Sequence, residues 1–314
     1  MKSKRFGIWL ALLIEVLLLT VLTSSFGGEK FFESTFLSWS NISQVIRALS
    51  FIAIMAVGQA LVLITAGVDL SVGSVLGLCG VITAVLLNHG SNIFIGIAAG
   101  IGAGIVCGAL NGFLITRAQL PPFIATLAMM SVARGLAFGL TGGETIRNLP
   151  ADFLTIGQGA VFGVPVPILV MVLLAIVAGY LLKSTTWGRY VYAIGGNEEA
   201  AHFSGVNVKK VKLIVYLLCG LTAGIAGVLF TSRFGVGQST AGLGYELDVI
   251  AAAVIGGVSL SGGRGTILGA IIGSLLMGIL RNGLVLLNVS EYWQEVAIGL
   301  VIILAVIIDR KSRK

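Results

Sequence analysis

The chain is a succession of long apolar runs separated by short polar connections. About 20 helical residues are needed to cross the hydrocarbon core of a bilayer, and runs of roughly this length recur throughout. Their residues do not alternate between apolar and polar, as the strands of a membrane β-barrel do. We therefore predict about ten transmembrane helices, at residues 7–25, 49–65, 70–88, 92–115, 123–140, 164–182, 213–231, 247–260, 266–287 and 292–308.

The composition agrees with a membrane protein. Hydrophobic residues make up 57% of the 314 positions and charged residues only 11%, which excludes an ordinary soluble domain. The predicted fold class is an all-α membrane protein, a polytopic helical bundle forming one domain over residues 1–314. The eighth run, 247–260, is shorter than most, and we expect it to be broken or partly re-entrant.

Basic residues predict the orientation of the bundle, because positively charged loops stay in the cytoplasm. Both ends of the chain are basic, so both are expected there, and an even number of spans follows. Ten spans satisfy this condition. They place Arg117, Lys183, Arg189, Lys209, Lys210, Lys212 and Arg264 inside with the terminal Lys2, Lys4, Arg5, Arg310, Lys311, Arg313 and Lys314, and leave Lys30, Arg47, Arg147 and Arg233 outside.

The formal charge of +7 follows from this topology. Its positive residues are spread over the inner loops, which favours contact with anionic membrane lipid and excludes a nucleic-acid partner. Residues 1–25 have the basic start and apolar core of a secretory signal. The run is long and no A-x-A-like site closes it, so we favour an uncleaved first helix.

A polar, glycine-bracketed break at residues 65–74 is the first candidate site. It carries Asp69 between two apolar runs, where an unpaired charge is costly and a functional role is the default hypothesis. Gly67 and Gly73 permit non-helical backbone, which survives at membrane depth only inside protein or beside water. The alternative is a turn in which Asp69 caps a helix that begins near Ser71; Asp69→Ala would then cost about 1 kcal/mol.

Glycines also mark helix faces. Gly96, Gly100, Gly104, Gly108 and Gly112 recur every four residues and predict one helix face that a neighbouring backbone approaches closely. Gly265, Gly269 and Gly273 repeat the pattern later in the chain. In the ten-span threading the two glycine helices run in opposite directions, so the fold is expected to consist of two inverted five-helix halves with a pathway between them.

The longest predicted inner loop, about 183–212, is the second candidate site. Asn197 is placed to cap a short helix, Glu198 and Glu199 suit its first turn, and Gly205 suits its end. A short helix of this kind fits a groove on a partner protein, although a helix lying on the membrane surface has a similar composition.

The sequence contains no constellation for catalysis. The stretch 260–264, Leu-Ser-Gly-Gly-Arg, imitates a signature of ABC-type ATPases, but the G-x-x-x-x-G-K-[ST] phosphate loop is missing. We read it as a tight turn between helices. No metal-ligand or cofactor pattern occurs either, and Cys79, Cys107 and Cys219 are interpreted as small packing residues inside spans.

Four motifs in order resemble the permease subunits of ABC importers for monosaccharides, of the ribose-transporter type. The resemblance covers the chain from about residue 45 onward. It rests on Ala66-Gly67-Val68-Asp69-Leu70-Ser71-Val72-Gly73-Ser74, on Leu120-Pro121-Pro122-Phe123-Ile124-Ala125-Thr126-Leu127 with Ala133-Arg134-Gly135-Leu136, on Ala193-Ile194-Gly195-Gly196-Asn197, and on residues 256–266.

The resemblance implies a function and partners. Glu199-Ala200-Ala201 followed by Gly205 looks like the coupling loop that such permeases insert into an ATPase, although the usual downstream proline motif is absent. The family's importers combine two permease subunits, an ABC ATPase and an external sugar-binding protein, periplasmic or lipid-anchored. ATP hydrolysis would then belong to the partner, and this chain would not be an enzyme.

Asp69, Ser71, Gly67 and Gly73 are the expected pathway or gating residues, with Arg134 as a partner for Asp69 or as a brace for packing near the outer surface. The expected location is a bacterial inner membrane. The alternatives are a permease for branched-chain amino acids or nucleosides, and an ion-coupled secondary transporter.

Overall fold

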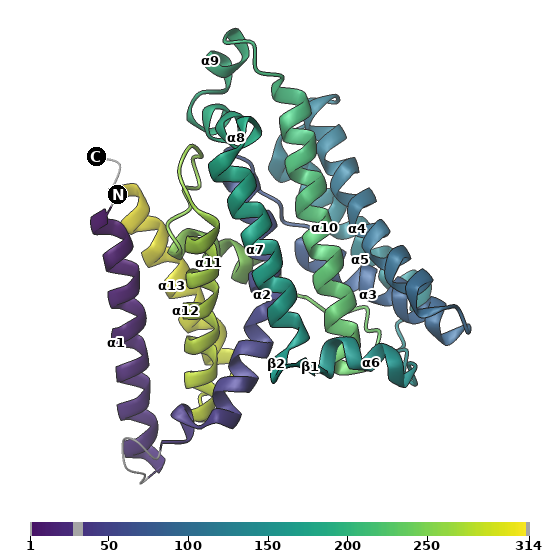
Figure 1. Ribbon diagram of the computed structural model, residues 1–314, viewed down its shortest axis with the longest axis vertical. Helices are drawn as coiled ribbons and strands as arrows, with labels where there is room; N and C mark the ends of the chain where they lie inside the picture. The colour runs from purple at the N-terminus through teal and green to yellow at the C-terminus, as the bar shows by residue number, and fades with distance from the viewer. Residues whose placement is uncertain (1, 28–33, 312–314) are drawn as a thin grey trace.

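The computed structural model describes residues 2–27 and 34–311, and Figure 1 shows that they form a helical bundle. Lys30, Arg313 and Lys314, which the charge argument used, lie outside the described residues. The elements are α1 Lys2–Gly27, η2 Thr35–Leu37, α2 Trp39–Ile64, α3 Val72–Asn88, α4 Ile93–Thr116, α5 Pro122–Thr141, α6 Ala151–Gln158, β1 Ala160–Val161, β2 Val164–Pro165, α7 Val166–Ser184, α8 Thr186–Gly196, α9 Glu198–Phe203, α10 Val208–Phe234, α11 Tyr245–Ile255, α12 Ile267–Leu286 and α13 Glu291–Lys311.

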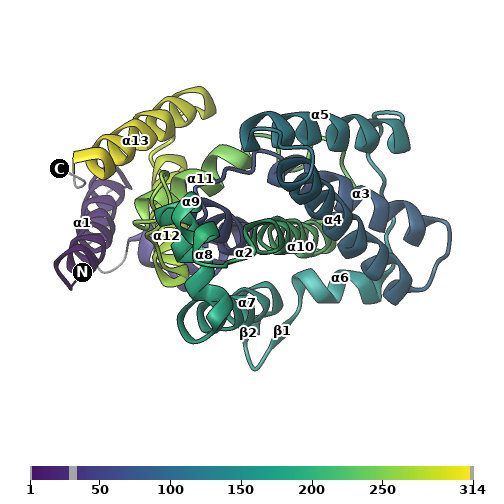
Figure 2. The same cartoon turned by 90° about the horizontal axis from the view of Figure 1, so that it is seen from above.

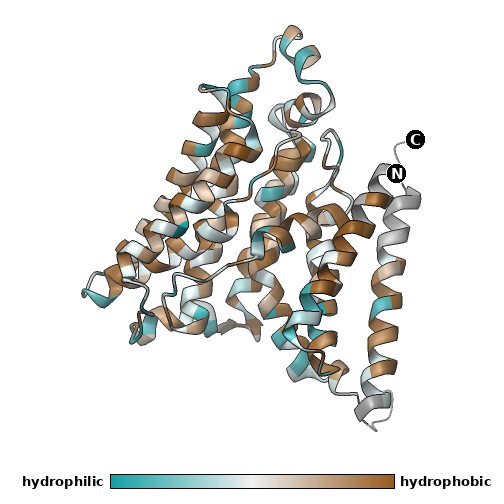
Figure 3. Ribbon diagram, turned by 180° about the vertical axis from the view of Figure 1, so that it is seen from behind, coloured by the Kyte–Doolittle hydropathy of each residue, from teal (hydrophilic) through white to brown (hydrophobic). Residues whose placement is uncertain are grey.

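Within the described residues, six helices are long and apolar enough to cross a membrane: α2, α4, α5, α7, α10 and α12. Two shorter apolar helices are α3 and the stretch Trp9–Ser25 of α1. Hydrophobic residues dominate the helices between the two ends of the molecule, while hydrophilic residues are concentrated toward the ends (Figure 3). A multi-pass membrane protein is the architecture that this pattern requires.

The long helices α2 and α10 form the centre of the bundle. Every residue from 53 to 64 of α2 is buried, and α10 packs against α2, α3 and α4. Seen from above, α10 lies between α2 on one side and the pair α3 and α4 on the other (Figure 2).

The glycine face predicted for residues 96–112 packs on α10. An added Cβ at Gly108 would lie 2.3 Å from the carbonyl oxygen of Tyr216, and one at Gly220 would lie 2.2 Å from that of Gly104. Only glycine permits two helix backbones to approach this closely. The second glycine helix, α12, packs in the same way on α11, since an added Cβ at Gly273 would lie 1.8 Å from the carbonyl oxygen of Ala252.

Two irregular connections approach the start of α3. The first, residues 65–71, joins α2 to α3 and contains Ala66 at a φ of 60°. The second, residues 235–244, runs beside α3. An added Cβ at Gly237 would meet the side chain of Ala84, and an added Cβ at Gly242 would meet the backbone of Gly73. Those two positions on α3 are about 16 Å apart along the helix axis.

The predicted eighth span is accordingly a half-length helix that follows an irregular segment, of which residues 239–244 form turns. The helix α11 has 11 residues and rises about 16 Å, half the thickness of the hydrocarbon core. The short length of its apolar run predicted a break, and the helical part is 245–255, not the whole of 247–260.

The two ends of the bundle differ. At one end lie α8 and α9, with the start of α1 and the end of α13 toward the same end; the opposite end carries α6 and the antiparallel hairpin of β1 and β2 (Figure 1). The short helix predicted at residues 197–205 is confirmed. The side chain of Asn197 accepts a hydrogen bond from the backbone of Ala200 at 2.9 Å, and Gly205 follows the helix with a φ of 83°.

Candidate transport pathway and coupling surface

Asp69 lies inside the protein, in the irregular segment between α2 and α3. Its Oδ1 accepts hydrogen bonds from the backbone N–H of Ser71 at 2.8 Å and from the Ser71 hydroxyl at 2.6 Å. From α4, the Asn111 side-chain amide donates to the Ser71 hydroxyl at 3.0 Å and lies 3.5 Å from Oδ2 of Asp69. All three residues are buried. The carboxylate therefore links the start of α3 to α4.

The backbone of the same segment is also held by side chains. In the orientation that satisfies its hydrogen bonds, the Gln59 amide donates to the carbonyl of Asp69 at 3.2 Å and accepts from its N–H at 3.3 Å. Gly67 packs on the Tyr216 hydroxyl of α10, and an added Cβ there would lie only 2.4 Å from that oxygen. Asp69 is not the N-cap of α3, which is Ser71. Its side chain instead binds that N-cap residue and turns the chain into α3 while enclosed by α2, α4 and α10.

Asn111 and Gln59 belong to this cluster, and the sequence analysis missed both. Each is a lone amide within an apolar span, which is the feature that could have drawn attention to it. Gly73, one of the predicted pathway residues, is the second residue of α3, where an added Cβ would meet the carbonyl oxygen of Gly242 at 2.2 Å.

Arg134 does not pair with Asp69. Its Nη1 donates to the carbonyl oxygens of Ser239 and Ala241, the latter at 2.8 Å. These carbonyls belong to the turns before α11. Thr126 lies two turns nearer the start of α5 than Arg134. Its hydroxyl contacts the Asp69 segment by donating a hydrogen bond to the carbonyl of Val68 at 3.4 Å. The alternative role, a brace for packing, describes Arg134 better than an ion pair does.

A second charged group, which the sequence analysis did not identify, ties α11 to its neighbours. Arg281 of α12 donates through Nη2 to Asp248 of α11 at 3.1 Å and to Glu295 of α13 at 3.2 Å. Asp248 is buried. A buried carboxylate requires a partner, so this arrangement fixes the half-length helix against α12 and α13.

The predicted coupling loop forms α8 and α9. Glu198 pairs with Lys212 at the start of α10, whereas Glu199 and Ala200 are exposed and Ala201 is buried. Phe203 is 79% exposed at the end of α9. A solvent-exposed aromatic ring beside an unpaired carboxylate is the composition of a surface that a protein partner covers.

The C-terminal end of α8 packs against the C-terminal end of α2. An added Cβ at Gly195 would lie 1.7 Å from the carbonyl oxygen of Ile64, and that carbonyl accepts a hydrogen bond from the N–H of Gly263 at 2.9 Å. The residue after Ile64 begins the segment that contains Asp69. The helix α8 and the segment that contains Asp69 therefore meet at the end of α2.

A family model described as "Branched-chain amino acid transport system / permease component" matches residues 41–306. The chain belongs to this family. Among its relatives, the ribose import permease protein RbsC of Escherichia coli K12 is 44% identical over 88% of this chain and 88% of its own length. RbsC of Bacillus subtilis is 44% identical over 98% and 94%, and the L-arabinose transport system permease protein AraH of E. coli K12 is 40% identical over 90% and 86%.

The permease also shares its fold with a solved ABC transporter of the metal-chelate type in an inward-facing conformation. The TM-score is 0.54, at 14% identity, over 99% of this chain and 97% of the other. The resemblance noted in the sequence is thereby confirmed as family membership. Within the part of the permease that the structure describes, Cys79, Cys107 and Cys219 are free and buried, and no group of acidic, His or Cys side chains could hold a metal ion.

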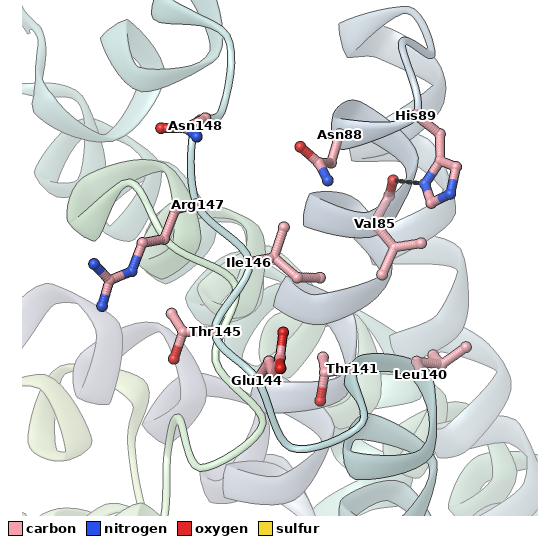
Figure 4. A pocket seen from close by; sticks show the side chains of 10 residues that line it. All are labelled: Val85, Asn88, His89, Leu140, Thr141, Glu144, Thr145, Ile146, Arg147 and Asn148. Carbon is pink, nitrogen blue, oxygen red and sulfur yellow. Dashed lines mark hydrogen bonds between the residues drawn. The ribbon is translucent and has the colours of Figure 1, made fainter.

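The end of the permease opposite α8 and α9 carries a pocket of about 340 Å³ (Figure 4). It opens between the end of α3 and the connection from α5 to α6. Its lining residues are Val85, Asn88, His89, Leu140, Thr141, Glu144, Thr145, Ile146, Arg147 and Asn148. The Nδ1 atom of His89 is held by the carbonyl of Val85 at 2.8 Å, so this ring is positioned by its own helix.

Proposed function

We propose that this chain is the permease subunit of an ATP-binding cassette importer for a monosaccharide, with ribose as the substrate. The observation that carries the proposal is the 44% identity to ribose import permeases of two bacteria, over 88% and 98% of this chain. The relative named for L-arabinose supports a pentose more broadly. The family description keeps branched-chain amino acids as the alternative substrate.

The proposal is tested by uptake in bacterial cells that lack their own ribose permease. The chain is expressed with its ATPase and binding protein, and entry of labelled ribose, arabinose and leucine is measured. We expect ribose uptake that stops when ATP is depleted. Leucine uptake without sugar uptake would assign the amino-acid alternative, and uptake that depends on an ion gradient instead of ATP would assign a secondary transporter.

The proposed complex contains two permease copies or a permease and a paralogue, an ABC ATPase, and an external sugar-binding protein. ATP hydrolysis is assigned to the ATPase, since this chain lacks a phosphate-binding loop. The proposed location is the inner membrane of a bacterium, with surrounding lipid in contact with the exposed apolar helix faces. In this orientation α8, α9 and both termini are cytoplasmic.

We further propose ten membrane crossings arranged as two inverted halves. The packing supports this arrangement, because α4 lies against α3 and α10 while α12 lies against α11 and α2. Exchanging α2 with α10, α3 with α11 and α4 with α12 maps one set of contacts onto the other. Each half then contains a long central helix, an irregular connection, and a helix that starts inside the bundle.

Coupling is assigned to α8 and α9, which would dock on the ATPase through residues 197–205. Movement of α9 would displace α8, which it contacts. The close approach of Gly195 to Ile64 would then transmit this displacement to the Asp69 segment. Asp69 and Ser71 then act in gating rather than in sugar contact, because both are enclosed by protein.

Glu199→Lys tests the docking surface. We expect about a tenfold loss of uptake and of sugar-stimulated ATP turnover, because reversing an interface charge introduces repulsion while Glu199 makes no contact that folding requires. Glu291→Lys, a reversal of an exposed charge at the start of α13, is the matched control. Unchanged ATPase capture and unchanged turnover in Glu199→Lys would remove this loop from the mechanism.

A further inference from the structure

Two opposite charges lie against the same face of α3 without forming an ion pair. Gly73 and Gly77 are one turn apart; an added Cβ at Gly73 would lie 2.5 Å from Oε2 of Glu246, and one at Gly77 would lie 3.1 Å from Nη1 of Arg134. Arg134 comes from the middle of α5 and Glu246 from the first turn of α11. Among the described residues three ion pairs form, and neither Arg134 nor Glu246 takes part in them.

Several polar atoms of these two residues have no partner within the described protein. Arg134 uses Nη1 for the carbonyls of Ser239 and Ala241, while its Nε and Nη2 are buried without a hydrogen bond. Oε2 of Glu246 is also buried and unpartnered. An unsatisfied buried polar atom costs about 1–3 kcal/mol. The two unpartnered donors of Arg134 and the unpartnered acceptor of Glu246 therefore require a ligand that both accepts and donates hydrogen bonds.

The surroundings of the two charges are apolar and uncovered. Val132 and Leu136 flank Arg134 on α5 and are each 53% exposed, and Leu243 and Leu247 flank Glu246 and are 71% and 56% exposed. Both charged residues are themselves only half-buried. Lipid tails do not tolerate such charges at membrane depth, so this face must line an aqueous path or contact another protein.

We propose that Arg134 and Glu246 form a binding site for sugar hydroxyl groups on the transport pathway, which runs along the α5 and α11 face toward the second permease copy. The inference rests on the proposed function. A hydroxyl group accepts from a guanidinium and donates to a carboxylate, so vicinal hydroxyls of a sugar satisfy both residues at once. In this conformation two carbonyls of the segment 235–244 bind the guanidinium, and movement of that segment frees it for the sugar.

The site is tested by measuring how permease variants transport ribose and ribose analogues that each lack one hydroxyl group. Permease, ATPase and binding protein are reconstituted in liposomes, and uptake is measured at saturating ribose, 2-deoxyribose and 3-deoxyribose. Glu246→Gln keeps the size of the side chain but not its charge. We expect it to lower ribose uptake about tenfold, and to lower uptake of at least one deoxy sugar less than about twofold, because the contact is already missing there.

Arg134→Lys provides a second variant, since lysine keeps the charge but loses the planar fork. Glu291→Gln is the control, because it removes an exposed charge at the start of α13, away from the pocket of Figure 4. Equal losses for ribose and both deoxy sugars in Glu246→Gln and Arg134→Lys would overturn the proposal and leave these residues as structural braces. Unchanged ribose uptake in both variants would overturn it as well. Absence of ribose uptake by the unmodified permease would instead contradict the proposed function.

Discussion

Asp69→Ala is expected to destabilise the permease by about 3–5 kcal/mol, because it leaves the Ser71 N–H and the Ser71 hydroxyl buried without their acceptor and removes the longer contact from the Asn111 amide. A helix cap alone would contribute about 1 kcal/mol. The measurement is thermal unfolding of the purified permease in detergent, together with its amount in the membrane. A loss of only about 1 kcal/mol would mean that the cluster does not act as a unit.

Asp69→Asn separates the fold from the transport cycle. The substituted side chain still offers an oxygen to both Ser71 groups, so we expect folded protein at nearly normal amounts. Hydrogen bonds to a charged acceptor are roughly twice as strong as neutral ones, and we expect uptake to fall at least about tenfold when the link from α3 to α4 weakens. Uptake equal to that of the unmodified permease, at matched amounts of protein, would reduce Asp69 to a structural role at the start of α3.

Gly195→Ala is expected to uncouple the ATPase from the pathway. The added methyl group would lie 1.7 Å from the carbonyl oxygen of Ile64 and 2.5 Å from the nitrogen of Gly263, so α8 must move away from the end of α2. The substitution changes no side chain inside a membrane-spanning helix and acts only on the end of α2 and on Gly263. We expect folded protein with at least about a tenfold loss of uptake, as overpacking at backbone contacts typically costs 1–3 kcal/mol.

Gly196→Ala is a closely matched control for this experiment. It makes the same change at the next residue of the same helix, where an added Cβ meets no atom within 4 Å. Both variants gain the same helix propensity, so any difference between them reports the contact with Ile64. Normal uptake and normal sugar-stimulated ATP turnover in Gly195→Ala would exclude this contact from the coupling route.

The features that were predictable from the sequence are those set by neighbours along the chain. The positions of the apolar helices followed from run length and bilayer thickness, and the short helix after Asn197 followed from its cap and its glycine. The glycine face of α4 was predictable because residues four apart share one side of a helix. The eight residues of α6 and the hairpin after it were missed, since neither has a run or period long enough to stand out.

Contacts between distant residues were decided by the tertiary structure alone. Asn111 meets Ser71 across 40 residues, Arg134 meets the carbonyl of Ala241 across 107, and Arg281 joins Asp248 to Glu295. The sequence showed that Asp69 and Arg134 each needed a partner at membrane depth, but pairing them with each other was wrong. A buried charge can be satisfied by a carbonyl, an amide or an opposite charge, and which one it meets depends on how helices far apart in the chain come to lie side by side.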